Sequence, residues 1–397
     1  MKSENVYEEI LNHWVSSEDR VLDYQVASLD DPIFDKYPHF GQFQNWLEKG
    51  YQGTMKFLEN HLDVRNNIRH LESGAQSVVV ILFAYPVALK GANDNGDNEN
   101  SRVNISSYAR SKDYHHEMRE AFLRLREICL TRIDELNIPK TPSQNLNQNS
   151  DEKSNPVEDF LFRSFSDSAP VFERDLATLL GLGWLGKNAC LINKQFGSGF
   201  FIGGFVSNIP FNEYLLQDKP EFTNIELQRP WDMAQDFCGG CTQCIDACPT
   251  SAIESPGVIK ANQCISYWTI EHQGKLNSTQ RKQSGDWAFG CDICQSVCPW
   301  NHKSIQKPTQ LQEATSSESN WPQNLESWLG LLRKGGGFKS QMKETPLYRA
   351  GRRKLLRNMF GVASYQGRLD LLDLLKEIRL EEEGDWSLEL DEIISEF

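Results

Sequence analysis

Residues 238–250 read CGGCTQCIDACPT, and residues 289–301 read FGCDICQSVCPWN. In both runs the last cysteine is followed directly by proline, and one more cysteine lies between the runs. Eight of the ten cysteines of the chain fall in this stretch: Cys238, Cys241, Cys244, Cys248, Cys264, Cys291, Cys294 and Cys298. The remaining two, Cys129 and Cys190, have apolar neighbours, and we expect a buried helix position and a buried strand position for them.

The first run has the spacing C-x2-C-x2-C-x3-C-P by which bacterial ferredoxins hold [4Fe–4S] clusters, and in that arrangement the fourth cysteine ligates the neighbouring cluster. The eight thiolates then form two complete sets: Cys238, Cys241, Cys244 and Cys298, and Cys248, Cys264, Cys291 and Cys294. Zinc is the main alternative, but it favours two C-x2-C pairs around one tetrahedral ion. Disulfide frameworks are typical of small secreted chains, and this chain has 397 residues.

Length and charge set the broad class of the protein. A chain of 397 residues predicts two or three globular domains. The formal net charge of -14 argues against indiscriminate nucleic-acid binding, although a local basic patch remains compatible with it. No apolar run approaches the ~20 residues of a membrane span. The N-terminal residues MKSENVYEEILNHW are acidic and amphipathic rather than leader-like. We therefore expect a monomeric cytoplasmic protein without a membrane partner.

The chain before the cysteines predicts an α/β domain over residues 1–230. Residues 77–87, SVVVILFAYPV, are typical of a buried central strand, and residues 6–14 and 114–136 have apolar positions at helical spacing. A helix is predicted to begin at Asp167 and end at Gly181, and two strands joined around Gly197 follow it. The glycines of residues 181–186 spell G-x-G-x-x-G, but they follow a helix, so they predict a tight connection rather than a dinucleotide site. Residues 91–101 and 141–156 are polar insertions.

Residues 231–305 then form the ferredoxin-like two-cluster domain, and residues 306–397 are predicted to be an α-helical C-terminal domain. Nine basic residues gather in its first part: Arg333, Lys334, Lys339, Lys343, Arg349, Arg352, Arg353, Lys354 and Arg357. In an acidic chain this concentration predicts contact with a phosphate backbone, and the alternative is a solvated helix face. Two clusters form a path for single electrons. The residues alone therefore predict a two-cluster reductase with a further cofactor, or a non-catalytic electron carrier.

Several segments occur together in the order known from one enzyme family: SDSAPVFERDLA, GLGWLGKNACLI, GSGFFIGGFVSNIPF, CISYWTIEHQG and the two cysteine runs. Over roughly residues 45–305 the chain resembles epoxyqueuosine reductase, the cobalamin-dependent, two-cluster enzyme of the last step of queuosine synthesis on tRNA. The resemblance implies a nitroreductase-like α/β domain that holds base-off cobalamin. It also implies a tRNA anticodon loop as substrate and an external low-potential electron donor, which the sequence does not identify. The two polar insertions and the short C-terminal region depart from longer members of the family.

Matched motif by motif, the resemblance implies that Asp167 is the proton donor of the reaction. It further implies a set of cofactor contacts: Arg65, Ser106, Asp167, Leu191, Ile202, Ser266, Cys291 and Asp292. Opening an epoxide produces an alkoxide, which needs a proton from a nearby acid. We expect burial to raise the pKa of Asp167 so that the acid is protonated near neutral pH. The structural alternative for Asp167 is a helix cap. A reductive dehalogenase has the same cofactor set, but such enzymes usually carry an export leader.

Overall fold

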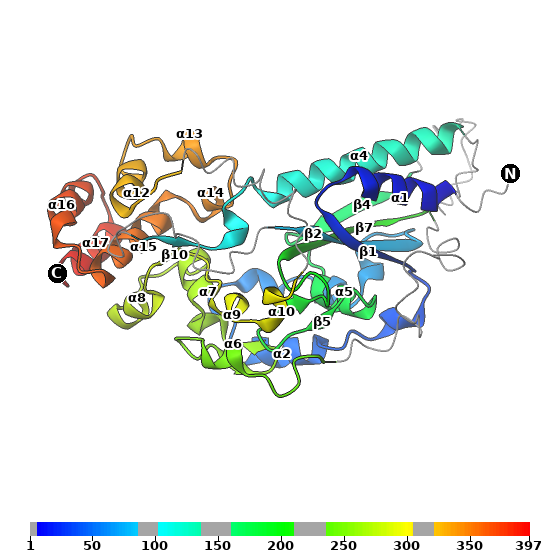
Figure 1. Ribbon diagram of the computed structural model, residues 1–397, viewed down its shortest axis with the longest axis horizontal. Helices are drawn as coiled ribbons and strands as arrows, with labels where there is room; N and C mark the ends of the chain where they lie inside the picture. Colours follow the sequence, from blue (N-terminus) through cyan, green and yellow to red (C-terminus); the bar gives the residue numbers. More distant parts are fainter. Residues whose placement is uncertain (1–5, 86–101, 136–159, 210–235, 305–320) are drawn as a thin grey trace.

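The computed structural model describes residues 6–85, 102–135, 160–209, 236–304 and 321–397. Within these ranges a four-stranded sheet with helices on both faces adjoins the short elements around the cysteines, and a group of helices follows (Figure 1). The fold is thus mixed α/β. The expected domain boundaries at 230 and 305, and both polar insertions, lie outside the described residues. No helix of the described part is both long enough and apolar enough to pass through a membrane.

The central sheet has the strand order β1-β2-β7-β4, and all its neighbouring strands are antiparallel. Its strands are β1 (Val21–Ser28), β2 (Ser77–Ala84), β4 (Phe162–Ser166) and β7 (Phe200–Ser207). All eight residues of β2 are buried. Val79, Ile81 and Phe83 pack under α1 (Val6–Ser17) and α4 (Tyr114–Glu135), and the alternate residues pack on the face that carries α5 (Glu173–Leu179). The predicted buried central strand is confirmed, because successive strand side chains enter opposite faces and both faces are covered.

Helix α4 also follows its sequence pattern. Met118, Phe122, Leu125 and Cys129 are all buried on the face that it turns to the sheet. Trp14 of α1 stacks on Phe122 at 6.3 Å between ring centroids, and its indole N–H donates to the carbonyl oxygen of Ala121. Figure 1 shows α4 and α1 side by side over one face of the sheet. The apolar spacing therefore predicted both the helix and its buried side.

The segment after β4 differs from the prediction. Helix α5 begins at Glu173, not at Asp167, and Phe172 is its N-cap residue. The glycine-rich connection from this helix to a strand is confirmed: Gly181 has φ +77°, and a Cβ on Gly183 would lie 2.4 Å from the carbonyl oxygen of Ile192. The two strands expected on either side of Gly197 are present, and they belong to different sheets. Strand β6 (Leu191–Ile192) pairs with β5 (Trp184–Leu185), whereas β7 joins the central sheet.

Short elements surround the cysteines, and longer helices follow them. The first are α6 (Gln243–Asp246), β8 (Ile253–Ser255), β9 (Val258–Ile259), α7 (Ile265–Ile270), α8 (Ser278–Ser284), β10 (Trp287–Phe289), α9 (Ile293–Ser296) and α10 (Pro299–His302). The later helices are α12 (Leu325–Leu332), α13 (Phe338–Met342), α14 (Leu347–Ala350), α15 (Arg352–Tyr365), α16 (Leu372–Leu380) and α17 (Asp385–Ile394). Shorter helices α2 (Phe40–Glu48) and α3 (Leu62–Asn66) lie before β2.

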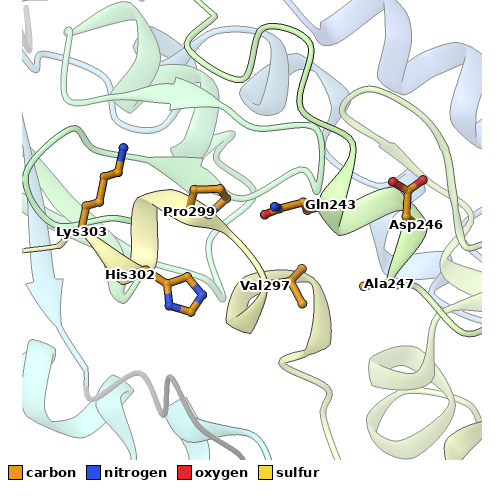
Figure 2. Close-up of a pocket in the computed structure, with 7 residues that line it drawn as sticks. All are labelled: Gln243, Asp246, Ala247, Val297, Pro299, His302 and Lys303. Carbon is orange, nitrogen blue, oxygen red and sulfur yellow. The ribbon is translucent and has the colours of Figure 1, made fainter.

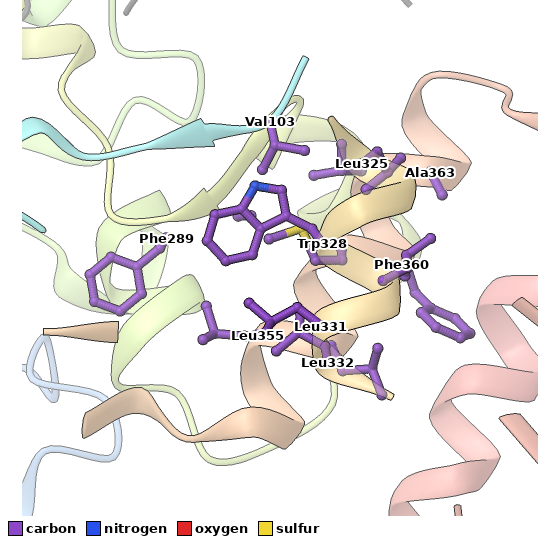
Figure 3. Packing of buried hydrophobic residues seen from close by; sticks show 14 of the residues in the cluster. Val103, Phe289, Leu325, Trp328, Leu331, Leu332, Leu355, Phe360 and Ala363 are labelled. Atoms are coloured by element: carbon purple, nitrogen blue, oxygen red, sulfur yellow. The ribbon is translucent and has the colours of Figure 1, made fainter. Parts of the chain in front are cut away.

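One core joins the later helices to the rest of the molecule. Strand β3 (Asn104–Ile105) runs parallel to β10, and both strands contribute to the apolar cluster that includes Trp328 of α12 and Phe360 of α15 (Figure 3). Trp328 is 3% exposed and Phe360 is fully buried. Removing such large apolar side chains from water is the main favourable term in packing. The C-terminal helices are therefore built into the fold by a shared hydrophobic core.

Candidate active site and cluster-binding region

Asp167 lies directly after β4, at a bend in the chain rather than at a helix end. Its φ of +45° is left-handed, which few residues other than glycine adopt. The hydroxyl of Tyr114 donates to Asp167 Oδ2 at 2.7 Å, and His115 Nε2 lies 3.3 Å from the same oxygen. Tyr114 and His115 begin α4, far from Asp167 in the sequence. The helix-cap alternative for Asp167 is wrong, since its carboxylate interacts with a different helix.

His115 lies among three charged side chains. Its Nδ1 lies 2.8 Å from Asp113 Oδ1, and its Nε2 faces Asp167. Arg349 Nη1, from α14, lies 2.7 Å and 2.6 Å from the two ring nitrogens. Burial and the Arg349 charge act to lower the pKa of His115, but the hydrogen bonds with Asp113 and Asp167 outweigh them, so the pKa lies above its ordinary value. The imidazolium form is favoured between the two carboxylates.

The pKa expected for Asp167 is corrected by this geometry. Desolvation acts to raise the pKa, as the sequence argument supposed. Hydrogen bonds from His115 and Tyr114, and the charges of His115 and Arg349, act in the opposite direction and lower it below its usual value. The side chain is also 63% exposed. At neutral pH Asp167 is therefore a carboxylate, and the raised pKa of His115 favours the protonated form of its ring.

Glu173 is a site residue that the sequence reasoning missed. It is the first residue of α5, and its Oε1 is buried without a hydrogen-bond partner in the described part of the chain. Burial, and to a smaller degree the Asp167 charge, raise the pKa of Glu173 to about 8. Arg65 is 8% exposed, donates to the carbonyl oxygen of Asn60, and interacts electrostatically with Glu173. The only sequence signal was the position of Glu173 in the segment SAPVFERDLA.

Ser106 and Asp292 meet across the two halves of the site. Asp292 is buried and accepts hydrogen bonds from the Ser106 hydroxyl and from the backbone and hydroxyl of Ser107, the last two at 2.7 Å. Gly290 has φ +68°, and a Cβ there would lie 2.5 Å from the Ser106 Cβ. The close approach of these two segments therefore requires glycine at position 290.

The other expected cofactor contacts lie at different depths. Leu191 of β6 is 3% exposed, and Ile202 of β7 packs against the same apolar cluster. Ser266 is half-buried on α7, and Cys291 is half-buried beside Asp292. The structure brings Ser106 to Asp292, and Arg65 to Glu173.

The cysteines of the two runs lie in two groups. Burial, followed by the charges of Cys238, Cys298 and Cys241, raises the pKa of Cys244. Burial also raises the pKa of Cys298, and Cys238 and Cys241 again contribute. These four residues, Cys238, Cys241, Cys244 and Cys298, are defined here as the first thiol group.

The second thiol group consists of Cys248, Cys264, Cys291 and Cys294. Burial raises the pKa of Cys291, and the charges of Cys264 and Cys248 add to it. The pKa of Cys294 is also raised, by burial and by the charges of Cys190, Cys291 and Cys264. Each group contains the four cysteines that the spacing assigned to one cluster; their role as ligands stays a prediction. Among the described residues, no three His, Cys, Asp or Glu side chains are placed to hold a single metal ion.

The remaining two cysteines are not in these groups. Cys129 is fully buried on α4, as expected. Cys190 lies directly before β6 rather than within it and is half-buried. Burial raises the pKa of Cys190 to about 12, and the charges of Cys298 and Cys244 act in the same direction. Cys190 in turn acts on the pKa of Cys294, so it interacts with cysteines of both thiol groups.

The basic segment of the C-terminal helices is partly used within the protein. Arg352 pairs with Glu382 at 2.7 Å, and Arg333 pairs with Glu381. Lys354 Nζ donates to the carbonyl oxygen of Ile270 at 2.7 Å. The guanidinium of Arg357 is buried and donates to the carbonyl oxygens of Gly274 and Trp268. These four cations stabilise the fold, so the basic segment is less available to a polyanion than its sequence indicated.

A second set of cations remains on the surface. Lys334, Lys339 and Lys343 are exposed and line a hollow of about 670 Å³, together with the glycines of residues 335–337. Arg349, also exposed, lies on α14 and reaches the His115 ring. This hollow is called the basic hollow below. Positive charge without a carboxylate in the lining favours an anionic ligand there.

Two family models match the regions just described. Residues 237–301 match the model described as "4Fe-4S double cluster binding domain". Residues 65–168 match "Epoxyqueuosine reductase QueG, DUF1730". The epoxyqueuosine reductase of Cyclobacterium marinum is 34% identical over 282 residues, which is 70% of this chain and 76% of the relative. The chain belongs to the epoxyqueuosine reductase family. As a member of that family it is an oxidoreductase with a double [4Fe–4S] cluster-binding domain.

Other members of the epoxyqueuosine reductase family align over more of the chain. The enzyme of Pseudomonas aeruginosa is 31% identical over 379 residues, covering 93% of this chain and 91% of the relative. A crystal structure of epoxyqueuosine reductase with an epoxyqueuosine-modified tRNA-Tyr stem loop has a TM-score of 0.72 at 21% identity. That comparison covers 99% of this chain and 98% of the other. The epoxyqueuosine reductase of Streptococcus thermophilus has a TM-score of 0.73 at 22% identity, covering 99% and 90%. These structural likenesses establish the fold.

Proposed function

We propose that this chain removes the epoxide oxygen of epoxyqueuosine in tRNA and leaves the alkene of queuosine. The reaction consumes two electrons and two protons, and the oxygen leaves as water. Membership of the epoxyqueuosine reductase family supports this function. The observation that carries it is the Asp167–His115 pair, a proton-holding site in the same chain as a region for two electron-carrying clusters.

We propose that each thiol group holds one [4Fe–4S] cluster. Four thiolates complete the ligand set of such a cluster, and the two groups contain four cysteines each. Cys294 of the second group interacts with Cys244 of the first, and Cys190 interacts with cysteines of both groups. This proximity supports electron transfer between the two sites. The chain thereby receives electrons one at a time.

A nitroreductase-like arrangement of the α/β part, with cobalamin bound, is the second element of the proposal. The residues fit a large polar group, because the buried Glu173 Oε1 lacks a partner among the described residues and lies near Arg65. The residues that would hold cobalamin are Arg65, Ser106, Asp167, Leu191, Ile202, Ser266, Cys291 and Asp292. Cobalamin supplies, when bound, a low-valent cobalt that accepts single electrons and is nucleophilic toward a strained ring. Asp292 would keep Ser106 in place through its hydrogen bond.

Asp167 and His115 would deliver the proton to the epoxide oxygen. The carboxylate of Asp167 is exposed, and the raised pKa of His115 supports this neighbouring ring as the holder of the transferable proton. Tyr114 fixes the carboxylate through a 2.7 Å hydrogen bond. Protonation of the departing oxygen would therefore pass through Asp167, and His115 would act as the proton reservoir.

We propose three domains, with residues 1–230 catalytic, 231–305 for the clusters and 306–397 for contact with tRNA. The exposed lysines of the basic hollow support phosphate contact in the last domain. A monomer is the proposed state. Ten free cysteines fit a reducing, cytoplasmic compartment.

The test is conversion of epoxyqueuosine to queuosine in a tRNA stem loop, followed by mass spectrometry. The chain, purified without oxygen and given cobalamin and a low-potential reductant, should produce the alkene, and a free nucleoside should be a poor substrate. Changing Lys334, Lys339 and Lys343 together to Gln should weaken stem-loop binding. It should also reduce the slope of log affinity against log salt by about 0.7 to 0.9 for each lost phosphate contact.

Arg353→Gln is a matched control for that lysine variant, because its guanidinium lies over the Trp386 ring outside the basic hollow. Unchanged affinity and salt slope in the lysine variant would exclude the basic hollow as the tRNA contact. Absence of any queuosine from the parent protein, with clusters and cobalamin present, would exclude the proposed reaction itself.

A further inference from the structure

A surface hollow of about 760 Å³ lies beside the first thiol group (Figure 2). Gln243 of α6 and Ala247, which caps that helix, line one side, and Pro299 and His302 of α10 line the other. In Figure 2 the side chain of Gln243 extends toward Pro299. The reaction chemistry described above uses none of these residues.

The hollow is separated from the first thiol group by single residues. Gln243 directly precedes Cys244, and Val297 and Pro299 flank Cys298 on both sides. Cys244 is half-buried behind this wall. The lining therefore adjoins two cysteines of the first thiol group, and through Ala247 it also adjoins Cys248 of the second group.

The form of the hollow favours a protein surface over a small molecule. Gln243, Asp246, His302 and Lys303, the polar side chains of its lining, are all exposed. A small-molecule site instead buries most of its ligand among a few convergent polar groups. The hollow is thus suited to a broad, shallow contact.

The lining of the hollow carries one lysine and one aspartate, and two further lysines lie at the loop of the first thiol group. Lys303 lies in the lining, and Lys187 Nζ donates to the carbonyl oxygens of Gly239 and Cys241 in the loop of the first thiol group. Lys194 Nζ lies 4.0 Å from the ring centroid of Phe237, next to Cys238. Against these three lysines stand Asp246 in the lining and Asp236 in the loop, so the named groups sum to +1, whereas the chain carries -14. An acidic partner is attracted here and repelled by most of the remaining surface.

We propose that this hollow is the docking surface for an acidic, low-potential electron-carrier protein. The carrier is oxidised by one electron at each encounter, and the cluster of the first thiol group is reduced by one electron. Two encounters supply the two electrons that epoxide removal consumes. This inference rests on the proposed function, because it requires the first thiol group to hold a cluster.

The test measures how fast the clusters are reduced by an acidic carrier. Reduced flavodoxin is mixed with the cluster-loaded protein in a stopped-flow instrument, and the bleaching of the cluster absorption is followed at several salt concentrations. Lys303→Glu should lower the second-order rate by about 5- to 20-fold at low salt, because steering contributes 10-fold or more to such rates. The difference should disappear at about 0.5 M salt, where the screening length is only a few ångströms. Gln243→Trp, which fills the hollow, should lower the rate at every salt concentration.

Two controls separate docking from other effects. Lys376→Glu changes the net charge by the same amount as Lys303→Glu, at an exposed position of α16 at the far end of the C-terminal helices (Figure 1). This variant should keep the parent rate. Photoreduced deazaflavin, a small neutral reductant, should reduce all variants equally, and iron content should be unchanged.

Equal flavodoxin rates for Lys303→Glu, Gln243→Trp and Lys376→Glu would overturn the docking surface. So would a parent protein that deazaflavin reduces but flavodoxin does not. Neither result affects queuosine formation with deazaflavin as the reductant. If that formation is absent, the proposed function fails, and the docking surface fails with it.

Discussion

Asp167→Asn changes the proton pathway while it keeps the shape of the side chain. The amide oxygen can still accept the hydrogen bond that Tyr114 donates, so the bend after β4 should persist. The variant loses the charge that faces His115 at 3.3 Å. Because the Asp167 side chain is 63% exposed, solvent screening limits that interaction to about 1 kcal/mol. The loss of this interaction should lower the His115 pKa toward its ordinary value.

The larger effect of Asp167→Asn should be on turnover. Positioned acids and bases contribute about 10²- to 10⁴-fold, so queuosine formation under single-turnover conditions should slow by that factor. Cobalamin affinity, stem-loop affinity and iron content should stay within about twofold of the parent, since a transferable proton is needed only in the chemical step.

Asp175→Asn is the matched control. Asp175 forms another Asp–His pair, with His39 Nδ1 at 2.8 Å, but it is outside the site. Any general effect of removing a carboxylate from such a pair should appear in both variants. Turnover of Asp167→Asn that equals turnover of Asp175→Asn would refute a role for Asp167 in proton delivery.

Three further results are expected. Cys264→Ala should reduce the iron content from about eight to about four atoms for each chain, because it removes one ligand of the second thiol group only; loss of all iron would contradict two separate clusters. Gly290→Ala should lower the free energy of unfolding by about 1–3 kcal/mol more than Gly367→Ala does. Both glycines have positive φ, but only a Cβ at position 290 meets Ser106. Denaturant unfolding measures the difference. Turnover should decline on the alkaline side, because the His115 pKa is raised above 6.5 and its proton is lost only as pH rises through that higher value. The decline should start at lower pH in Asp167→Asn. A pH profile of turnover with no alkaline decline would exclude His115 as the proton reservoir.

The sequence by itself determined the elements whose pattern is local. The run at residues 77–84 is apolar at every position, so it had to be a strand buried on both faces, and it is. The cysteine spacing in turn predicted two sets of four thiols, and the interactions of Cys244 and of Cys291 are with cysteines of their own set. That each set holds a cluster stays a prediction. Family membership followed from the same segments.

Only the tertiary structure decided the ionisation of the active-site acid. Burial is the one effect on the pKa of Asp167 that the sequence suggests, and burial would raise that pKa. The groups that lower it are distant in the chain: Tyr114 and His115 are more than 50 positions away, and Arg349 is further still. The same limit applied to the basic segment. Its density of charge was visible in the sequence, but the pairing of Arg352 with Glu382 and the burial of Arg357 were not. A pKa and a free surface charge both depend on which distant groups come within a few ångströms, and folding alone sets those distances.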